Sequence, residues 1–163
     1  MKLLLRNLIV AAVLTILGVV SASMSAADTV NAGFFGTWKM NSFKSKADPG
    51  PLVKSQIVTI EPHGDSFTLT TDAEDAQGAK SHTTRTASLD GKEIAVDANN
   101  SNVKETYTRL NDRSFQRVLK VNGQVRNTLK ATLSEDGQRF TIDATGTSAT
   151  GKPVHNITVF DKQ

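Results

Sequence analysis

The feature that most constrains this chain is a series of turn dipeptides that cuts it into short segments rich in threonine, valine and isoleucine. Asn122-Gly123, Asp136-Gly137 and Thr150-Gly151 place three glycines at a spacing of 14 residues. Asn-Gly and Asp-Gly favour the positive backbone angles of tight hairpin turns. No amphipathic helical pattern longer than about two turns lies between these turns. The sequence therefore predicts one hairpin after another.

The spacing of the turns predicts ten strands. They cover Gly36–Phe43, Ser55–Glu61, Ser66–Thr71, Ala79–Ser88, Glu93–Asp97, Val103–Leu110, Ser114–Val121, Gln124–Ser134, Arg139–Thr145 and Lys152–Lys162. Apolar and polar residues alternate most clearly in the eighth and ninth, as in an antiparallel sheet with one buried face. A meander of this length must protect its edge strands, and closure into a barrel does so. The expected fold class is all-β: an up-and-down antiparallel meander closed into an eight- to ten-stranded barrel.

The first 27 residues have the composition of a secretory signal peptide. Lys2 and Arg6 precede an apolar run over Leu8–Val20, and small residues follow as far as Ala27. The run is shorter than the roughly 20 residues that span a membrane. We expect a signal-peptide helix over residues 1–27, cleaved after Ala27 or alternatively after Ser25, and a single domain over residues 28–163. The product would be exported, periplasmic or secreted, without stable membrane insertion; an uncleaved anchor is the alternative.

Charge and composition exclude several classes of function. The formal net charge is +3, from 19 basic and 16 acidic residues, and it falls to +1 once Lys2 and Arg6 are removed. A nucleic-acid-binding protein would show a basic face or stripe. The chain has no cysteine, so disulfides and thiolate chemistry are excluded. No metal-binding spacing occurs among its three histidines, and no catalytic, phosphate-binding or dinucleotide motif is present. We expect no cofactor, no metal and no enzymatic activity.

The segment Phe34-Phe35-Gly36-Thr37-Trp38-Lys39 opens the first strand with Gly-x-Trp. Residues 157–163, Ile-Thr-Val-Phe-Asp-Lys-Gln, close the chain, and Ser45-Lys46 follows the opening strand. This pattern resembles the lipocalin and fatty-acid-binding protein superfamily, in particular small exported bacterial lipocalin-like proteins. The resemblance implies a barrel whose tryptophan plugs the closed end and whose interior holds a ligand.

Two departures from this superfamily matter for the ligand. The interval Lys44–Lys54 contains Pro49-Gly50-Pro51 and is too short for the helical lid of intracellular fatty-acid-binding proteins. The superfamily's carboxylate-binding Arg-x-Tyr on the last strand aligns with Thr158 and Phe160. Another group must therefore bind any polar head.

The candidate ligand-binding residues combine apolar side chains with one polar cluster. Alternation places Arg117 on the same face as Phe115 and Leu119, so it needs a buried partner or a wet cavity. Glu105 and Tyr107 could supply that partner inside the barrel, and Arg117 would then bind an anionic or carbonyl-bearing head group. A shift of one residue would instead put Arg117 on the surface. The candidates are Trp38, Met40, Phe67, Tyr107, Arg117 and Phe140; for Trp38 a role as core plug competes with one as cavity wall.

Three functions are compatible with such a barrel. The first is non-enzymatic binding of a small hydrophobic or amphiphilic molecule. The second is a periplasmic protein-interaction module, an inhibitor or envelope stress factor, with a filled interior and the Lys44–Lys54 loop as its contact element. The third is an isomerase or cyclase that uses Tyr107 and Arg117. Large inward side chains that fill the whole barrel would favour the second function, and a roomy channel would favour the first.

Overall fold

The computed structural model describes residues 30–97, 100–148 and 150–163, and these form an antiparallel β-structure. The expected signal peptide lies outside the described residues. In the described part, a short 3-10 helix, η1, precedes eleven strands. They are η1 (Ala32–Phe34), β1 (Gly36–Met40), β2 (Lys46–Asp48), β3 (Ser55–His63), β4 (Ser66–Glu74), β5 (Lys80–Ala87), β6 (Asp90–Asp97), β7 (Asn100–Asn111), β8 (Ser114–Val121), β9 (Gln124–Leu133), β10 (Arg139–Thr147) and β11 (Pro153–Lys162).

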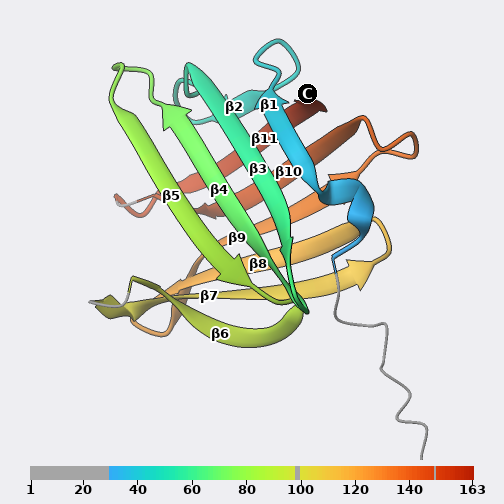
Figure 1. Cartoon of the computed structure of the whole chain (residues 1–163). Coiled ribbons are helices and arrows are strands. Elements are labelled where there is room, and N and C mark those ends of the chain that lie inside the picture. Colours follow the sequence, from blue (N-terminus) through green and yellow to red (C-terminus); the bar gives the residue numbers. More distant parts are fainter. Residues whose placement is uncertain (1–29, 98–99, 149) are drawn as a thin grey trace, which may run out of the picture.

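Ten strands make a nearly closed barrel in the order β5-β4-β3-β1-β11-β10-β9-β8-β7-β6 (Figure 1). Pairing of β1 with β11 joins the first and last strands, with Trp38 opposite Lys162. The sheet ends at β5 and β6, and no ladder between these two strands is found in the described part of the chain. Figure 1 shows β5 and β6 diverging from the corner that connects them. We call this unpaired boundary the seam.

The expected antiparallel meander is confirmed, but the first strand was predicted too long. It ends at Met40 rather than Phe43, because Asn41 to Ser45 form a turn held by its own side chains. The Ser45 hydroxyl donates to the Asn41 carbonyl (2.7 Å) and accepts from the Val159 amide (3.0 Å). The chain then pairs with β11 again as β2, inside the interval expected to be a loop. No helix occupies that interval, as expected.

Aromatic side chains fill one end of the barrel. Phe34, Trp38, Phe67 and Phe160 are fully buried. The Phe140 ring stacks on Phe160 at 4.6 Å and meets Trp38 edge-on at 4.9 Å. The Trp38 indole donates to the Phe34 carbonyl (2.8 Å), which fixes η1 against this end. The expected position of Trp38 in the core is confirmed, and we refer to this aromatic layer as the closed end.

The opposite end of the barrel is polar and more open. Residues 80–84 of β5 are exposed on both faces of the strand. The hairpin from β8 to β9 turns at this end through Asn122 and Gly123, whose φ angles are +53° and +76°. Two consecutive positive φ angles define the turn type that matches strand twist, as the Asn-Gly signal predicted.

Within the described residues, no helix reaches the length and apolar character needed to cross a membrane.

Candidate ligand-binding cavity

A cavity of about 140 Å³ lies inside the barrel, next to the closed end. Its wall is mostly apolar, and the few polar side chains in it come from β3, β4, β7 and β8. The lining residues are Gln56, Val58, Ile60, Leu69, Thr71, Tyr107, Phe115, Arg117, Leu129, Ala131, Phe140 and Ile142. The barrel interior is therefore not completely filled by its own side chains.

Arg117 is the cationic group of the cavity wall, and its partners lie on the flanking strands. Its Nη1 donates to Glu105 Oε1 on β7 (2.9 Å), and its Nη2 donates to Asn127 Oδ1 on β9 (2.5 Å). Its Nε is buried and has no hydrogen-bond partner in the described structure. Arg117 thus presents an unused donor within the barrel wall, although two of its nitrogens are already bound.

Glu105 is the buried centre of this cluster, with only 2% of its surface exposed. Its Oε2 accepts from the Tyr107 hydroxyl (3.0 Å) and lies 3.3 Å from Arg85 Nε on β5. A buried carboxylate is stable only when charged or polar donors surround it. Here two guanidinium groups and one phenol do so, and we call Arg85, Glu105, Tyr107, Arg117 and Asn127 the polar cluster.

The strand register explains why these residues meet. Tyr107 on β7 lies directly opposite Arg117 on β8, and Glu105 lies one inward position along β7. Inward residues alternate with period two, so all three side chains enter the barrel. The structure therefore brings together the three residues that the alternation had suggested. The alternative register, with Arg117 on the surface, is not observed.

The Tyr107 phenol is held in its protonated form. Burial raises the pKa of Tyr107 above its ordinary value, and the negative charge of Glu105 raises it further. A neutral phenol can donate to the Glu105 carboxylate, whereas a phenolate would repel it. Tyr107 therefore serves as a fixed donor rather than as a group that exchanges protons near neutral pH.

Two members of the polar cluster, Arg85 and Asn127, are not among the site residues predicted from the sequence. Arg85 lies two positions before the buried Ala87 on β5, and that spacing places both side chains on the inward face. Asn127 lies on the same face of its strand as Leu129, but its partner does not follow from that pattern, because Arg117 reaches it across the β8–β9 pairing.

The six candidate ligand-binding residues fall into two groups. Tyr107, Arg117 and Phe140 line the cavity. Trp38, Met40 and Phe67 are buried in the core and do not line it. At the position of the superfamily's carboxylate clamp, Phe160 is fully buried against Phe140, and Thr158 pairs with Ile142. The polar cluster thus occupies different strands from that clamp.

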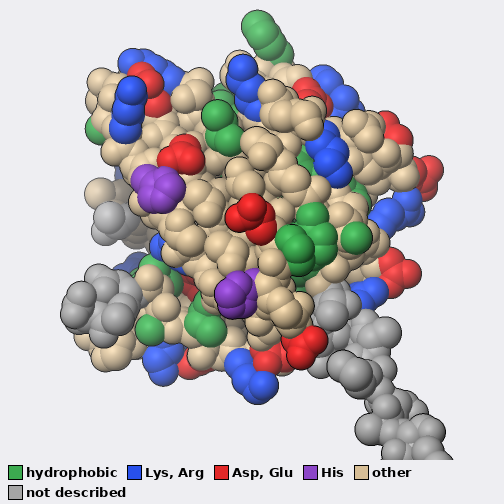
Figure 2. All heavy atoms as spheres, in the orientation of Figure 1, with side chains coloured by type: hydrophobic (Ala, Val, Ile, Leu, Met, Phe, Trp, Pro, Cys, Tyr) green, Lys and Arg blue, Asp and Glu red, His purple; other side chains and the backbone are tan. Residues whose placement is uncertain are grey.

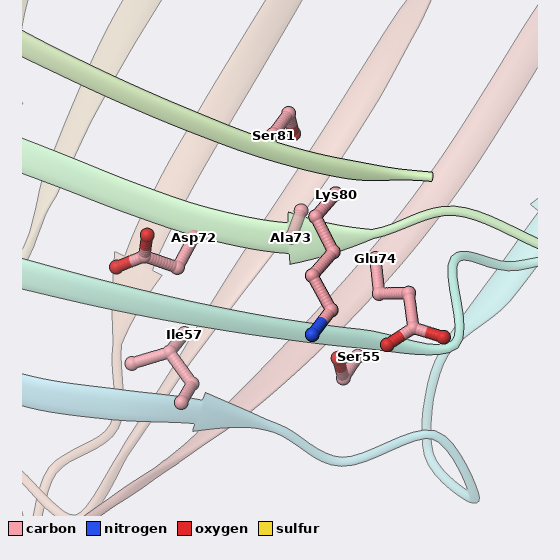
Figure 3. Close-up of a pocket in the computed structure, with 7 residues that line it drawn as sticks. All are labelled: Ser55, Ile57, Asp72, Ala73, Glu74, Lys80 and Ser81. Atoms are coloured by element: carbon pink, nitrogen blue, oxygen red, sulfur yellow. The ribbon is translucent and has the colours of Figure 1, made fainter. Parts of the chain in front are cut away.

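A second hollow of about 240 Å³ lies on the surface, where β3, β4 and β5 run side by side (Figure 3). Figure 3 shows the Lys80 side chain extending across the strands toward β3. Nearby polar side chains already have partners: Lys54 lies 3.4 Å from Glu74, and His82 lies 2.7 Å from Asp72. These exposed pairs describe a solvated surface rather than a ligand site.

The described residues and the face drawn in Figure 2 show how potential metal ligands and basic side chains are distributed. In the portion of the chain that the structure describes, no group of three or more His, Asp and Glu side chains is placed to hold a metal ion. Figure 2 shows basic and acidic side chains interspersed on one face of the molecule, without a continuous basic stripe.

The sequence matches no protein-family model and no curated protein. Its structure is similar to the zebrafish ileal bile acid-binding protein in complex with cholic acid, with a TM-score of 0.52 and 13% identity over 81% of this chain and 100% of that chain. It also matches the siderocalin Ex-FABP, with a TM-score of 0.44 and 13% identity over 81% of this chain and 71% of that one. The first likeness shows a shared β-barrel fold, in agreement with the barrel that the sequence predicted.

Proposed function

We propose that this protein is a non-enzymatic binding protein for a small amphiphilic molecule, held inside the barrel. The apolar part of the ligand lies against the cavity wall, and its anionic or carbonyl-bearing head contacts Arg117 and Tyr107. One observation carries this proposal: a cavity with mostly apolar walls has an arginine in its lining, and the Nε of that arginine has no partner. Such a combination is typical of sites that bind small molecules.

The size of the cavity limits the ligand. At about 140 Å³ it is close to the roughly 150 Å³ of an engineered protein cavity that binds benzene. A short alkyl chain or a single ring therefore fits without rearrangement. Drug-sized ligands usually occupy pockets of about 300 Å³ or more. Short-chain amphiphiles are accordingly the ligands to test first.

We also propose that the protein is exported and that its barrel binds a small molecule rather than a protein partner. The composition of the N-terminal 27 residues supports export, so the ligand would be met in the periplasm or outside the cell. The protein-interaction alternative assumed a filled barrel, and the open cavity favours ligand binding instead.

Calorimetric titration of the protein with hexanoate tests the proposal, with Arg117→Met as the variant and Arg126→Met as its control. Arg126 is an exposed arginine on β9. We expect saturable binding, unchanged in the control and weakened at least about tenfold by Arg117→Met, because a charge-assisted hydrogen bond is lost. Absence of saturable binding by hexanoate, hexanol and hexyl phosphate alike would refute the proposal.

A further inference from the structure

We infer that Glu105 is a specificity-determining residue, which makes the cavity select a head group with one negative charge over one with two. The inference rests on the proposed function and extends it from a kind of ligand to the charge of its head. It also assigns Arg85, on the far side of the seam, a part in binding that the cavity lining alone does not reveal.

The polar cluster carries a net positive charge. Arg85 and Arg117 each approach a different oxygen of the same carboxylate, at 3.3 and 2.9 Å. Two guanidinium groups and one carboxylate leave a net charge of +1. The next arginine along β7, Arg109, does not change this sum, because it pairs with Asp112 at 2.5 Å. Among the described residues, one positive charge of the cluster is thus left without an anion inside the barrel wall.

Burial of the cluster strengthens the attraction between its net charge and an anionic head group. Glu105 is 2% exposed, and the side chains of Arg85 and Arg117 are 24% and 20% exposed. Charges in such surroundings interact more strongly than charges in water, since little solvent screens them. The Nε atoms of both arginines are buried without a partner in hydrogen-bond geometry, but Arg85 Nε is the atom that lies 3.3 Å from Glu105 Oε2. Arg117 Nε therefore has donor capacity to spare, which an anionic head can use.

The three charged side chains lie at increasing distance from the cavity. Arg117 lines the cavity, Glu105 lies behind it, and Arg85 lies beyond Glu105 on the other side of the seam. A head group in the cavity contacts Arg117 first. The negative charge of Glu105 lies behind that guanidinium and repels the head group from there. A single negative charge brings the cluster to neutrality. A second would leave it at −1 beside a buried carboxylate, which is the unfavourable arrangement.

Two substitutions change the cluster charge in opposite directions. Arg85→Gln gives a neutral cluster and keeps the contact between Glu105 and Arg117, whereas Glu105→Gln gives a cluster of +2. Lys130→Gln is the control, because it removes a positive charge from the exposed face of β9. Arg85→Gln is the safer variant, since Glu105→Gln leaves two arginines without their carboxylate.

The experiment titrates the protein and its variants with hexanol, hexanoate and hexyl phosphate, which share one chain and differ in head charge. The pH is kept well above the second phosphate pKa of about 6. The unmodified protein and Lys130→Gln should bind hexanoate best. In Arg85→Gln hexanoate binding should fall at least about tenfold while hexanol binding stays unchanged, and in a folded Glu105→Gln the preference should move toward hexyl phosphate by at least about tenfold.

The outcomes separate the two proposals. If all three ligands bind saturably and Arg85→Gln leaves their relative affinities unchanged, this inference is overturned and the proposed function stands. Equal losses of hexanol and hexanoate in Arg85→Gln would also overturn it, because they indicate a purely structural role for Arg85. Binding of none of the three ligands would overturn both proposals.

Discussion

At the scale of single residues, the molecule places its polar groups according to whether they can be satisfied. Glu105 is buried only because Arg85, Arg117 and Tyr107 supply donors from three strands. Trp38 is buried with its one donor bonded to the Phe34 carbonyl. The first arrangement sets two arginines against one carboxylate, whereas the second satisfies the single side-chain donor of Trp38.

Removal of the Tyr107 hydroxyl tests how far the polar cluster supports the fold. Tyr107→Phe deletes the donor that lies 3.0 Å from Glu105 Oε2 and keeps the ring edge-on to Phe67 at 5.6 Å. Hydrogen bonds to charged groups contribute about 1.5–3 kcal/mol, so we expect the free energy of unfolding in urea to drop by about that amount. Thr70→Val is the matched control, because its hydroxyl contacts only Thr84 in an exposed pair. Equal, small effects in both variants would mean that Glu105 needs no phenol.

At the scale of strands, alternation and turn dipeptides carry most of the information. Ten strands were predicted, and each overlaps one of the ten barrel strands. The break after Met40 was missed, because it depends on contacts between the Asn41–Ser45 turn and Val159, which lies far along the chain. Arg85 was missed for the same reason: its partner Glu105 lies across the seam, and no pattern within one strand identifies it. Local patterns predict strands and their faces, whereas partners across strands require the register.

The pairing of β9 with β10 is close enough to require glycine at one position. A Cβ atom at Gly146 would meet the Arg126 carbonyl oxygen and lie 3.1 Å from the Asn127 Cα. Both are backbone atoms, which move only if β9 itself shifts, so we expect Gly146→Ala to lower the free energy of unfolding by about 1–3 kcal/mol. Thr147→Ala, at the exposed neighbouring position, should stay within about 0.5 kcal/mol.

Gly146→Ala also connects strand packing to the cavity. Asn127 accepts from Arg117 and donates to the Thr145 carbonyl (3.2 Å), so a displaced β9 disturbs the polar cluster. Hexanoate binding should weaken in Gly146→Ala and remain unchanged in Thr147→Ala. Unaltered stability and binding in Gly146→Ala would show that the two strands separate at little cost.

At the scale of the whole molecule, the barrel is a sheet whose two edges are held near each other without backbone pairing. The Arg85–Glu105 contact joins β5 to β7 across the seam, and the closed end packs beneath it. The strands and the inward placement of Glu105, Tyr107 and Arg117 follow from one alternating pattern, because the inward face that makes the core also supplies the cavity wall. The size and lining of the cavity do not follow from that pattern, since residues of several strands form it only in the assembled barrel.

Surface carboxylates give the whole molecule a predictable response to acid. Hydrogen bonds from Lys92 lower the pKa of Asp90 from 3.8 to about 2, and bonds from Asn41 and Arg139 lower the pKa of Asp161. A carboxyl group whose pKa is lower in the folded state stabilises that state above its unfolded pKa and loses this effect as the pH falls through its folded pKa. The melting temperature should therefore be nearly constant down to about pH 4 and then fall toward about pH 2.

The variant Asp90→Asn separates this linkage from general acid unfolding. Asparagine cannot titrate, so the variant should begin with a lower melting temperature at neutral pH and lose less of it between about pH 4 and pH 2. Added salt should reduce the difference between the two proteins, because the contact of Asp90 with Lys92 at 2.7 Å involves an exposed lysine. Parallel melting curves for the two proteins over this range would show that Asp90 has the same pKa in the folded and unfolded chain, and the stabilising role of its bonds to Lys92 would have to be abandoned.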